Sequence, residues 1–274
     1  MEDKKLVINA NDFGKSKIIN KSVLFAYHNG FLTAASLCVN GNAFDTAVNE
    51  IIPECPNLSI GISLNISDGY SLTKAPLLTN LKSEFRNSFL KIFIKSFNDE
   101  FMKQLEFEFR TQIETVMNYT KVSFITSQND IHAIPKIFEL TAKLAKEYNI
   151  PFIETHCEEI YFVQSLKSYL NLNFPINFVK TLILNFFTEK NKKYLEKTEL
   201  RTNDNIISNE YRNLMNNSTF EYGLSVIKKS SLTQIDIVPK NTVKSGYFVD
   251  LSKELKDKIT RMGFEITSYK KEYE

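Results

Sequence analysis

The sequence is poor in cysteine and lacks the spacings that usually signal disulfide frameworks or zinc sites. Its three cysteines, Cys38, Cys55 and Cys157, are an odd number and include no C-x-x-C pair. Cys38 lies in the apolar run 34–39, which is typical of a small core residue. We therefore expect neither a disulfide-stapled fold nor a zinc knuckle.

Long apolar runs are missing as well. The most apolar late stretch, residues 178–187, is short and contains Lys180 and Asn185, whereas a helix that crosses a bilayer needs about 20 mostly apolar residues. Residues 1–5 are polar and lead directly into a strand-like run, without the apolar core of a signal peptide. These features predict a cytoplasmic protein that does not enter a membrane.

No excess of charge of one sign is present. The 34 Lys and Arg residues nearly balance 32 Asp and Glu residues, for a formal net charge of +2. Nucleic-acid binders usually gather basic residues in a patch, whereas here they are interleaved with acidic ones. The sequence also contains neither a G-x-G-x-x-G after its first strand nor a Walker A loop, the usual signatures of nucleotide binding. We expect no nucleic-acid partner.

Strands and helices alternate along the chain, which is typical of a parallel sheet covered by helices. About seven such units favour a closed or nearly closed (β/α) barrel, with a doubly wound sheet as the runner-up. The expected strands cover residues 6–8, 34–39, 58–66, 124–127, 151–155, 206–208, 234–238 and 264–269, and the expected helices cover 18–28, 44–52, 83–97, 100–119, 135–148 and 252–262.

One stretch departs from this alternation. Residues from about 160 to 200 are rich in aromatic residues and lysine and show no strand pattern. Their period and composition predict a helical segment inserted into the barrel. We therefore expect a single barrel domain over residues 1–274.

Polar side chains follow the first strand, where Asn11 and Asp12 precede Gly14. In a barrel the active site lies at the carboxyl ends of the strands, so this is a place for chemistry. Asn and Asp also cap helices well, and a cap for the following helix is the competing interpretation. On the third strand, Ser63 and Asn65 share one face.

Two later strand ends are also polar. Asp130 and His132 would point the same way if the strand before them continued, but a polar turn is an equal alternative. Glu154, His156 and Glu158 alternate along one strand face. They could bind metal or transfer protons, or they could be an exposed strand end in which His156 pairs with a glutamate.

In their order and spacing these motifs resemble those of the YdjC-like carbohydrate deacetylases. That family carries N-A-D-D-F-G after the first strand, G-x-H-x-N on the third, then D-S-H-x-H-x-H-x-x-P, and a late H-P-G. Residues 9–14, 61–65, 126–135 and 235–239 of this chain stand at the matching places. The resemblance covers nearly the whole chain. It implies a distorted (β/α) barrel, a divalent-metal site and a carbohydrate ligand, with an N-acetylated sugar as the candidate.

The chain departs from the family at the residues that carry the chemistry. Asn11 stands at the position of the catalytic base, whereas Asp12 keeps the acid that binds the metal. The two metal-ligand histidines correspond to Ser63 and Gln128, and the histidine of H-P-G corresponds to Val238. Hydroxyl and amide oxygens are weak zinc ligands, and an amide cannot act as a general base. We expect no cofactor, or a weakly bound divalent metal such as Mg or Zn.

The resemblance also implies a set of substrate-facing positions. An arginine of a later strand corresponds to Glu154 or a residue nearby, and His132 is retained. We expect Asp130, His132, Glu154 and His156 to contact the substrate. Phe13 and Tyr70 are candidate stacking faces for a sugar. Asn11, Asp12, Ser63, Gln128 and His132 should converge at one mouth of the barrel.

Three hypotheses follow. The leading one is a pseudoenzyme that binds a carbohydrate or a partner protein at a degraded metal site. The alternative is an active hydrolase, a carbohydrate N-deacetylase, with a rebuilt site made from Asp12, Asp130 and His132 and a new base from Glu154, His156 or Glu158. The third is that only the fold is shared and the function is unrelated. The sequence makes no prediction of oligomeric state.

Overall fold

A parallel sheet forms the centre of the molecule. The computed structural model describes residues 4–163, 173–212, 214–227, 231–237 and 249–273. The strands follow the order β5–β4–β3–β2–β1–β7–β6, and β8 pairs with β1. Their bounds are β1 Lys4–Phe13, β2 Ala34–Leu37, β3 Ser59–Leu64, β4 Phe124–Ser127, β5 Phe152–Ile153, β6 Asn205–Ile207, β7 Leu232–Ile237 and β8 Phe264–Ile266.

The long strand β1 organises this sheet. Its first residues, Lys4–Leu6, pair with β8, its later residues pair with β2, and residues 5–10 pair with β7. Leu6, Val7 and Ile8 are fully buried, as expected for a parallel strand whose two faces are both covered.

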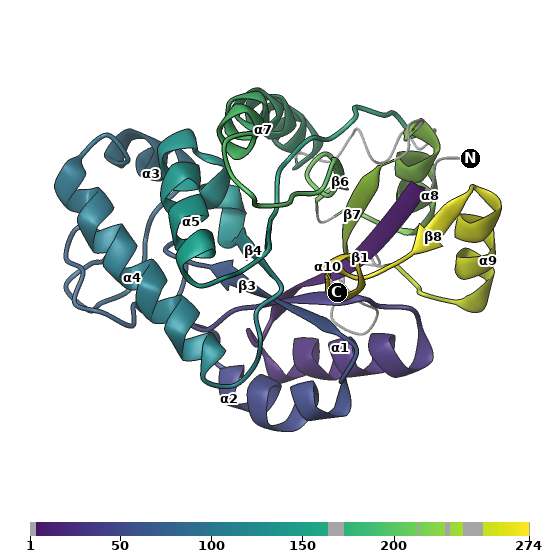
Figure 1. The fold of residues 1–274 in the computed structure, drawn as a ribbon, viewed down its shortest axis with the longest axis horizontal. Helices are drawn as coiled ribbons and strands as arrows, with labels where there is room; N and C mark the ends of the chain where they lie inside the picture. The colour runs from purple at the N-terminus through teal and green to yellow at the C-terminus, as the bar shows by residue number, and fades with distance from the viewer. Residues whose placement is uncertain (1–3, 164–172, 213, 228–230, 238–248, 274) are drawn as a thin grey trace.

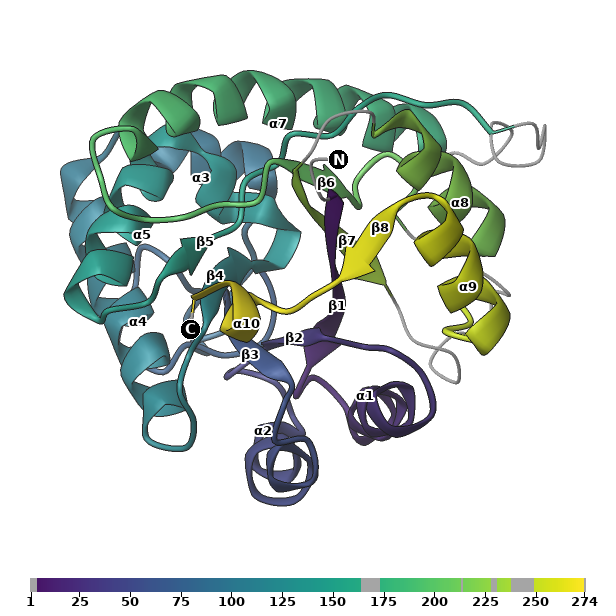
Figure 2. The ribbon, with the colours of Figure 1, turned by 45° about the vertical axis from the view of Figure 1, so that its right-hand side comes forward.

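The sheet curls until its two end strands approach each other, as Figures 1 and 2 show. Phe152 of β5 forms an isolated parallel bridge with Arg201, just before β6. The amide of Ile206 donates a hydrogen bond of 2.8 Å to the carbonyl of Cys157. The predicted distorted (β/α) barrel is confirmed, and its distortion lies in this loose closure and in the strand order around β1.

Helices surround the sheet (Figure 2). The helix α1 begins after Ser16, whose hydroxyl accepts a hydrogen bond from the amide of Ile19, and so caps the helix. Among described residues, no helix is both long and apolar enough to cross a membrane. The helices are α1 Lys17–Asn29, α2 Phe44–Thr46, α3 Phe89–Lys95, α4 Asp99–Met117, α5 Pro135–Glu147, α7 Asn173–Leu195, α8 Asn217–Val226, α9 Lys253–Arg261 and α10 Tyr269–Tyr273, with short 3₁₀ or π turns at Ala47–Ile51, Ile52–Glu54 and Gln128–Ala133.

Several predicted boundaries were wrong. The helix expected over 83–97 begins only at Phe89, because Ser88 caps it and Ser83 takes a left-handed φ of 60°. The strand expected over 264–269 ends at Ile266, before α10, and the strand over 151–155 is shorter than predicted.

The expected helical segment near 160–200 contains α7, while residues 164–172 lie outside the described residues. Its interpretation as an insertion into one domain of 1–274 stays a prediction. The three cysteines are free.

Candidate functional site

An irregularity at the carboxyl end of β1 sets the direction of Asn11 and Asp12. The register with β2 shifts between Ala10 and Phe13, and such bulges re-aim side chains. Asp12 has a left-handed φ of 62°, a conformation that Asp adopts more readily than most residues. Gly14 follows with φ 87°, where a Cβ atom would lie 3.0 Å from the carbonyl oxygen of Cys38.

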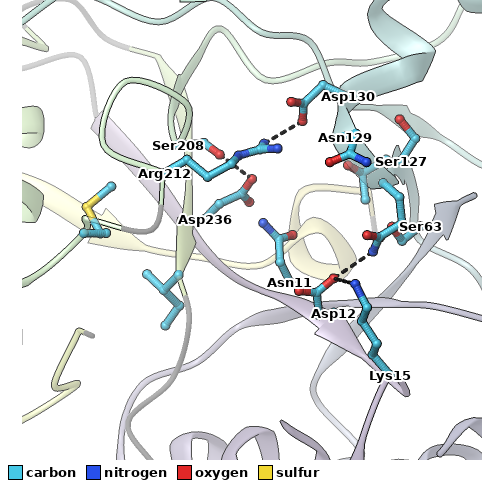
Figure 3. A pocket seen from close by; sticks show the side chains of 14 residues that line it. Asn11, Asp12, Lys15, Ser63, Ser127, Asn129, Asp130, Ser208, Arg212 and Asp236 are labelled. Carbon is cyan, nitrogen blue, oxygen red and sulfur yellow. Dashed lines mark hydrogen bonds and ion pairs between the residues drawn. The ribbon is translucent and has the colours of Figure 1, made fainter. Parts of the chain in front are cut away.

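A cavity of about 220 Å³ lies above this end of the sheet (Figure 3). Asn11, Asp12, Ser63 and Gln128, four of the five residues expected to converge, line it. They come from the ends of β1, β3 and β4. The fifth, His132, is fully buried and does not line the cavity.

Hydrogen bonds join the three positions that the resemblance implies as metal ligands. They run from the side-chain amide of Gln128 to Asp12 and Ser63. The Nε2 atom of Gln128 donates a hydrogen bond of 2.8 Å to Oδ1 of Asp12 and a longer one of 3.4 Å to Oγ of Ser63. The Nζ atom of Lys15 lies 3.7 Å from the same Asp12 oxygen and 3.6 Å from Asp68. Asp12 therefore already has a hydrogen-bond donor in Gln128 and a cation in ion-pair distance in Lys15.

This donor set fits a zinc-like metal poorly. It offers one carboxylate, one hydroxyl and one amide, whereas zinc sites are built from thiolate, imidazole and carboxylate. The amide nitrogen of Gln128 points at the carboxylate of Asp12. If the amide were turned over, its oxygen would face a carboxylate oxygen, and the two acceptors would repel each other.

On the opposite side of the cavity, Asp130 is held by two cations. The Nη2 atom of Arg212 donates a 2.7 Å hydrogen bond to Oδ1, and Nζ of Lys180 lies 2.5 Å from Oδ2. Burial alone would raise the pKa of Asp130, but Arg212, Lys180 and His156 together hold it well below its ordinary value. The strand before Asp130 does not continue; a turn with left-handed φ at Asn129 and Asp130 replaces it.

His132 lies behind the cavity wall with both ring nitrogens in use. Its Nε2 is 3.0 Å from the carbonyl oxygen of Glu154, and its Nδ1 is 2.6 Å from Oγ of Ser127. A carbonyl only accepts, so Nε2 carries the proton and Nδ1 accepts from the Ser127 hydroxyl. Burial, and then His156, lower the pKa of His132 to about 3, which keeps the ring neutral.

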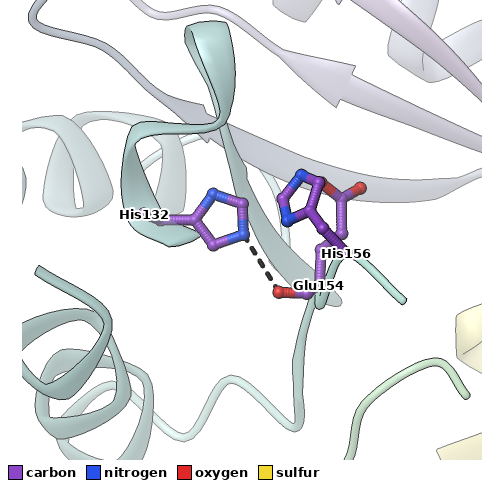
Figure 4. Close-up of side chains that lie close together, drawn as sticks. All are labelled: His132, Glu154 and His156. Atoms are coloured by element: carbon purple, nitrogen blue, oxygen red, sulfur yellow. Dashed lines mark hydrogen bonds and ion pairs between the residues drawn. The ribbon is translucent and has the colours of Figure 1, made fainter. Parts of the chain in front are cut away.

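His132, Glu154 and His156 form a buried cluster whose potential ligand atoms lie within 4.8 Å of one another (Figure 4). His156 Nε2 is 3.3 Å from Glu154 Oε1 and 3.2 Å from Asp130 Oδ1. Thr126 donates a 2.7 Å hydrogen bond to the same Glu154 oxygen. Burial, followed by the charge of Asp236, raises the pKa of Glu154 well above its ordinary value. Both His132 nitrogens are engaged and offer no free ligand atom to a metal, whereas both ring nitrogens of the buried His156 have no hydrogen-bond partner among the described residues.

Glu154, His156 and His132 do not line the cavity, so their expected contact with a substrate stays a prediction. Phe13 is fully buried, and the prediction that it stacks on a sugar was wrong. Tyr70 is 58% exposed and lines a neighbouring cavity of about 150 Å³ that shares Lys15 and Gln128 with the first. Val238 lies outside the described residues.

The sequence interpretation missed several cavity residues, namely Lys15, Ser208, Arg212 and Asp236. Asp236 was inside the expected strand 234–238, and its charge among apolar neighbours was a usable signal. Arg212 lies in a stretch without strand or helix periodicity, where no pattern indicated it.

A family model described as YdjC-like protein matches residues 5–242. A carbohydrate deacetylase from Brevibacillus brevis is 34% identical over 148 residues, which are 54% of this chain and 58% of that protein. One from Clostridium beijerinckii is 32% identical over 150 residues, with the same coverage. The match thus spans little more than half the length of these curated relatives.

A solved structure from Enterococcus faecalis V583 has a similar fold. It is described as a cellobiose-phosphate cleavage protein, and it superposes with a TM-score of 0.73 over 98% of both chains, at 20% identity. This likeness supports the fold.

Proposed function

Since the chain belongs to the YdjC-like family, we propose that it is a carbohydrate-binding member whose cavity does not perform metal-dependent deacetylation. The observation that carries this proposal is the hydrogen bonding of Gln128 Nε2 to Asp12 and, more weakly, to Ser63. An amide donor, rather than a third metal ligand, faces the one carboxylate of the set.

The position of the base supports the same conclusion. Asn11 lines the cavity, and its Oδ1 accepts a 3.0 Å hydrogen bond from Asn9 Nδ2. A neutral amide cannot take a proton from an attacking water at ordinary pH. A bound water at this place would be oriented but not activated.

A carbohydrate is the ligand class that the cavity suits. Its lining is mostly polar and offers hydroxyl, amide, carboxylate and guanidinium groups, for example Ser63, Asn129 and Ser208. Such groups match the dense hydroxyl donors and acceptors of a sugar. The curated relatives are named carbohydrate deacetylases, which favours a sugar over the partner protein that we also considered.

The alternative, an active hydrolase built from Asp12, Asp130 and His132, has less support. His132 uses both ring nitrogens within the core, and Asp130 is paired with Arg212 and Lys180. A divalent cation would have to compete with both of these charges. The cytoplasmic location stays a prediction from the sequence.

Calorimetric titration with zinc tests the proposal. The natural protein should show no tight, stoichiometric zinc binding. The triple variant Asn11→Asp, Ser63→His, Gln128→His restores two carboxylates and two imidazoles on the same strand ends. It should bind zinc at least about 100-fold more tightly, or ~2.8 kcal/mol. Tight zinc binding by the natural protein that is lost in Asp12→Asn would refute the proposal.

A further inference from the structure

We propose that Asp236 recognises the ammonium group of an amino sugar, so that the cavity prefers a free amino sugar to its neutral or N-acetylated counterparts. This inference rests on the proposed carbohydrate-binding function and specifies its ligand.

Three carboxylates line the cavity, those of Asp12, Asp130 and Asp236. Asp12 lies beside Lys15, and Asp130 contacts both Arg212 and Lys180. Each of these carboxylates therefore has a cation of the protein as its partner. Asp236, the remaining carboxylate of the lining, has a different set of partners.

Among the described residues, the hydrogen bonds to Asp236 come from three neutral groups (Figure 3 shows the one from Ser208). Asn9 Nδ2 and Gln234 Nε2 donate to Oδ1 at 2.9 and 2.8 Å, and Ser208 Oγ donates to Oδ2 at 2.9 Å. A carboxylate has about four acceptor positions. One position, on Oδ2, is therefore available to a ligand in the cavity.

Arg212, which also lines the cavity, is a competing cation. It interacts electrostatically with Asp236, but its hydrogen bond goes to Asp130, the larger electrostatic partner. The charge of Asp236 also acts on Glu154, whose pKa it helps to raise. These contacts leave Asp236 fixed in place with its charge only partly offset.

Asp236 also lies next to Asn11. Asn9 is paired with Asp236 across β1 and β7, and its Nδ2 donates both to Asp236 and, at 3.0 Å, to Asn11 Oδ1. The cavity thus has a carboxylate on β7 close to the amide on β1. An ammonium group, with three donors, can bind a carboxylate and neighbouring amide or hydroxyl oxygens together.

A charge-assisted hydrogen bond of this kind is stronger than a neutral one. We expect glucosamine to bind about tenfold more tightly than glucose or N-acetylglucosamine, which corresponds to ~1.4 kcal/mol. Calorimetry with the three sugars, below the amine's pKa of about 8, measures this preference directly. The preference should fall as the pH rises through that value, while binding of N-acetylglucosamine stays constant.

Two variants separate Asp236 from general charge effects. Asp236→Asn should abolish the preference for glucosamine and keep binding of the neutral sugars. Asp257→Asn removes the same charge from an exposed side chain that does not line the cavity, and it should keep the preference. Equal binding of all three sugars by the natural protein, or a preference without pH dependence, would overturn the inference and leave carbohydrate binding intact. Binding of none of the three would instead count against the proposed function itself.

Discussion

The two sides of the cavity differ in how they hold their charges. On the β1 side, Asp12 is 37% exposed and is met by an amide and a distant lysine. On the other side, the Asp130 side chain is 4% exposed and is bound by Arg212 and Lys180 at short range. Exposed charges are screened and exchange partners at little cost, whereas buried ones need compensation. The β1 side can therefore tolerate substitution, while the Asp130 side is part of the stability of the fold.

The strongest test of this comparison removes one cation from the buried side. Arg212→Met keeps an unbranched apolar stem but leaves Asp130 without its guanidinium partner. Because Lys180 alone then offsets the buried carboxylate, we expect the free energy of unfolding to fall by about 3 kcal/mol, the lower end for a broken buried ion pair. Urea denaturation at neutral pH measures this loss.

As a control, Arg86→Met removes an exposed guanidinium that pairs with Glu84 at 2.9 Å; a change within about 0.5 kcal/mol is expected there. Similar losses in both variants would mean that the two sides do not differ as described.

The low pKa of Asp130 also makes its stabilisation depend on pH. Its stabilisation is fully present above the ordinary pKa of 3.8 and is lost as the pH falls below that value.

An intermediate effect is expected from Glu158, which is also buried behind the cavity. Its carboxylate accepts backbone hydrogen bonds from Ser208, Asn209 and Glu210, but burial raises its pKa to about 7. The folded protein therefore holds this proton more tightly than the unfolded chain, whose ordinary value is 4.5. The stabilisation that Glu158 contributes should be fully present below pH 4.5 and fall by about 3 kcal/mol as the pH rises to 7.

Unfolding titrations at several pH values should show this slope in the natural protein. In Glu158→Gln, which cannot titrate, the slope between pH 4.5 and 7 should be smaller. Glu210, whose pKa burial raises to about 8, should leave a residual slope in the variant. An unchanged slope would show that Glu158 does not carry the effect.

The smallest effect is expected on the β1 side. Gln128→Ala removes the hydrogen bonds to Asp12 and Ser63, but water and Lys15 can replace them because Asp12 is partly exposed. A loss of no more than about 1 kcal/mol is expected in thermal or urea unfolding. The matched buried change is Ser127→Ala, which leaves His132 Nδ1 without its donor. If Gln128→Ala proved the more damaging of the two, the proposed contrast between the sides would be wrong.

The candidate site was predictable where its residues follow an apolar strand directly. Asn11, Asp12, Ser63 and Gln128 could be placed at the cavity because parallel strands present their carboxyl ends at one edge. The sequence did not show that Asp130 and His132 have different places, one at the cavity and the other in the core. The left-handed turn at Asn129 and Asp130 sends Asp130 to the cavity and His132 into the core, and no strand periodicity indicates such a turn.

What the sequence by itself determined is the alternation of strands and helices and the residue types that stand at the strand ends. The apolar periodicity predicts buried strands and amphipathic helices, whatever their tertiary arrangement. The absence of imidazole at positions 63 and 128 limits the affinity for a zinc-like metal in any arrangement. The tertiary structure alone decided which charges meet. Arg212 and Asp130 are 82 residues apart, and Asn9 and Asp236 are 227 apart. Electrostatic and hydrogen-bond energies depend on distance and burial, which arise only when the curled sheet brings β1, β7 and the turn after β4 to one cavity.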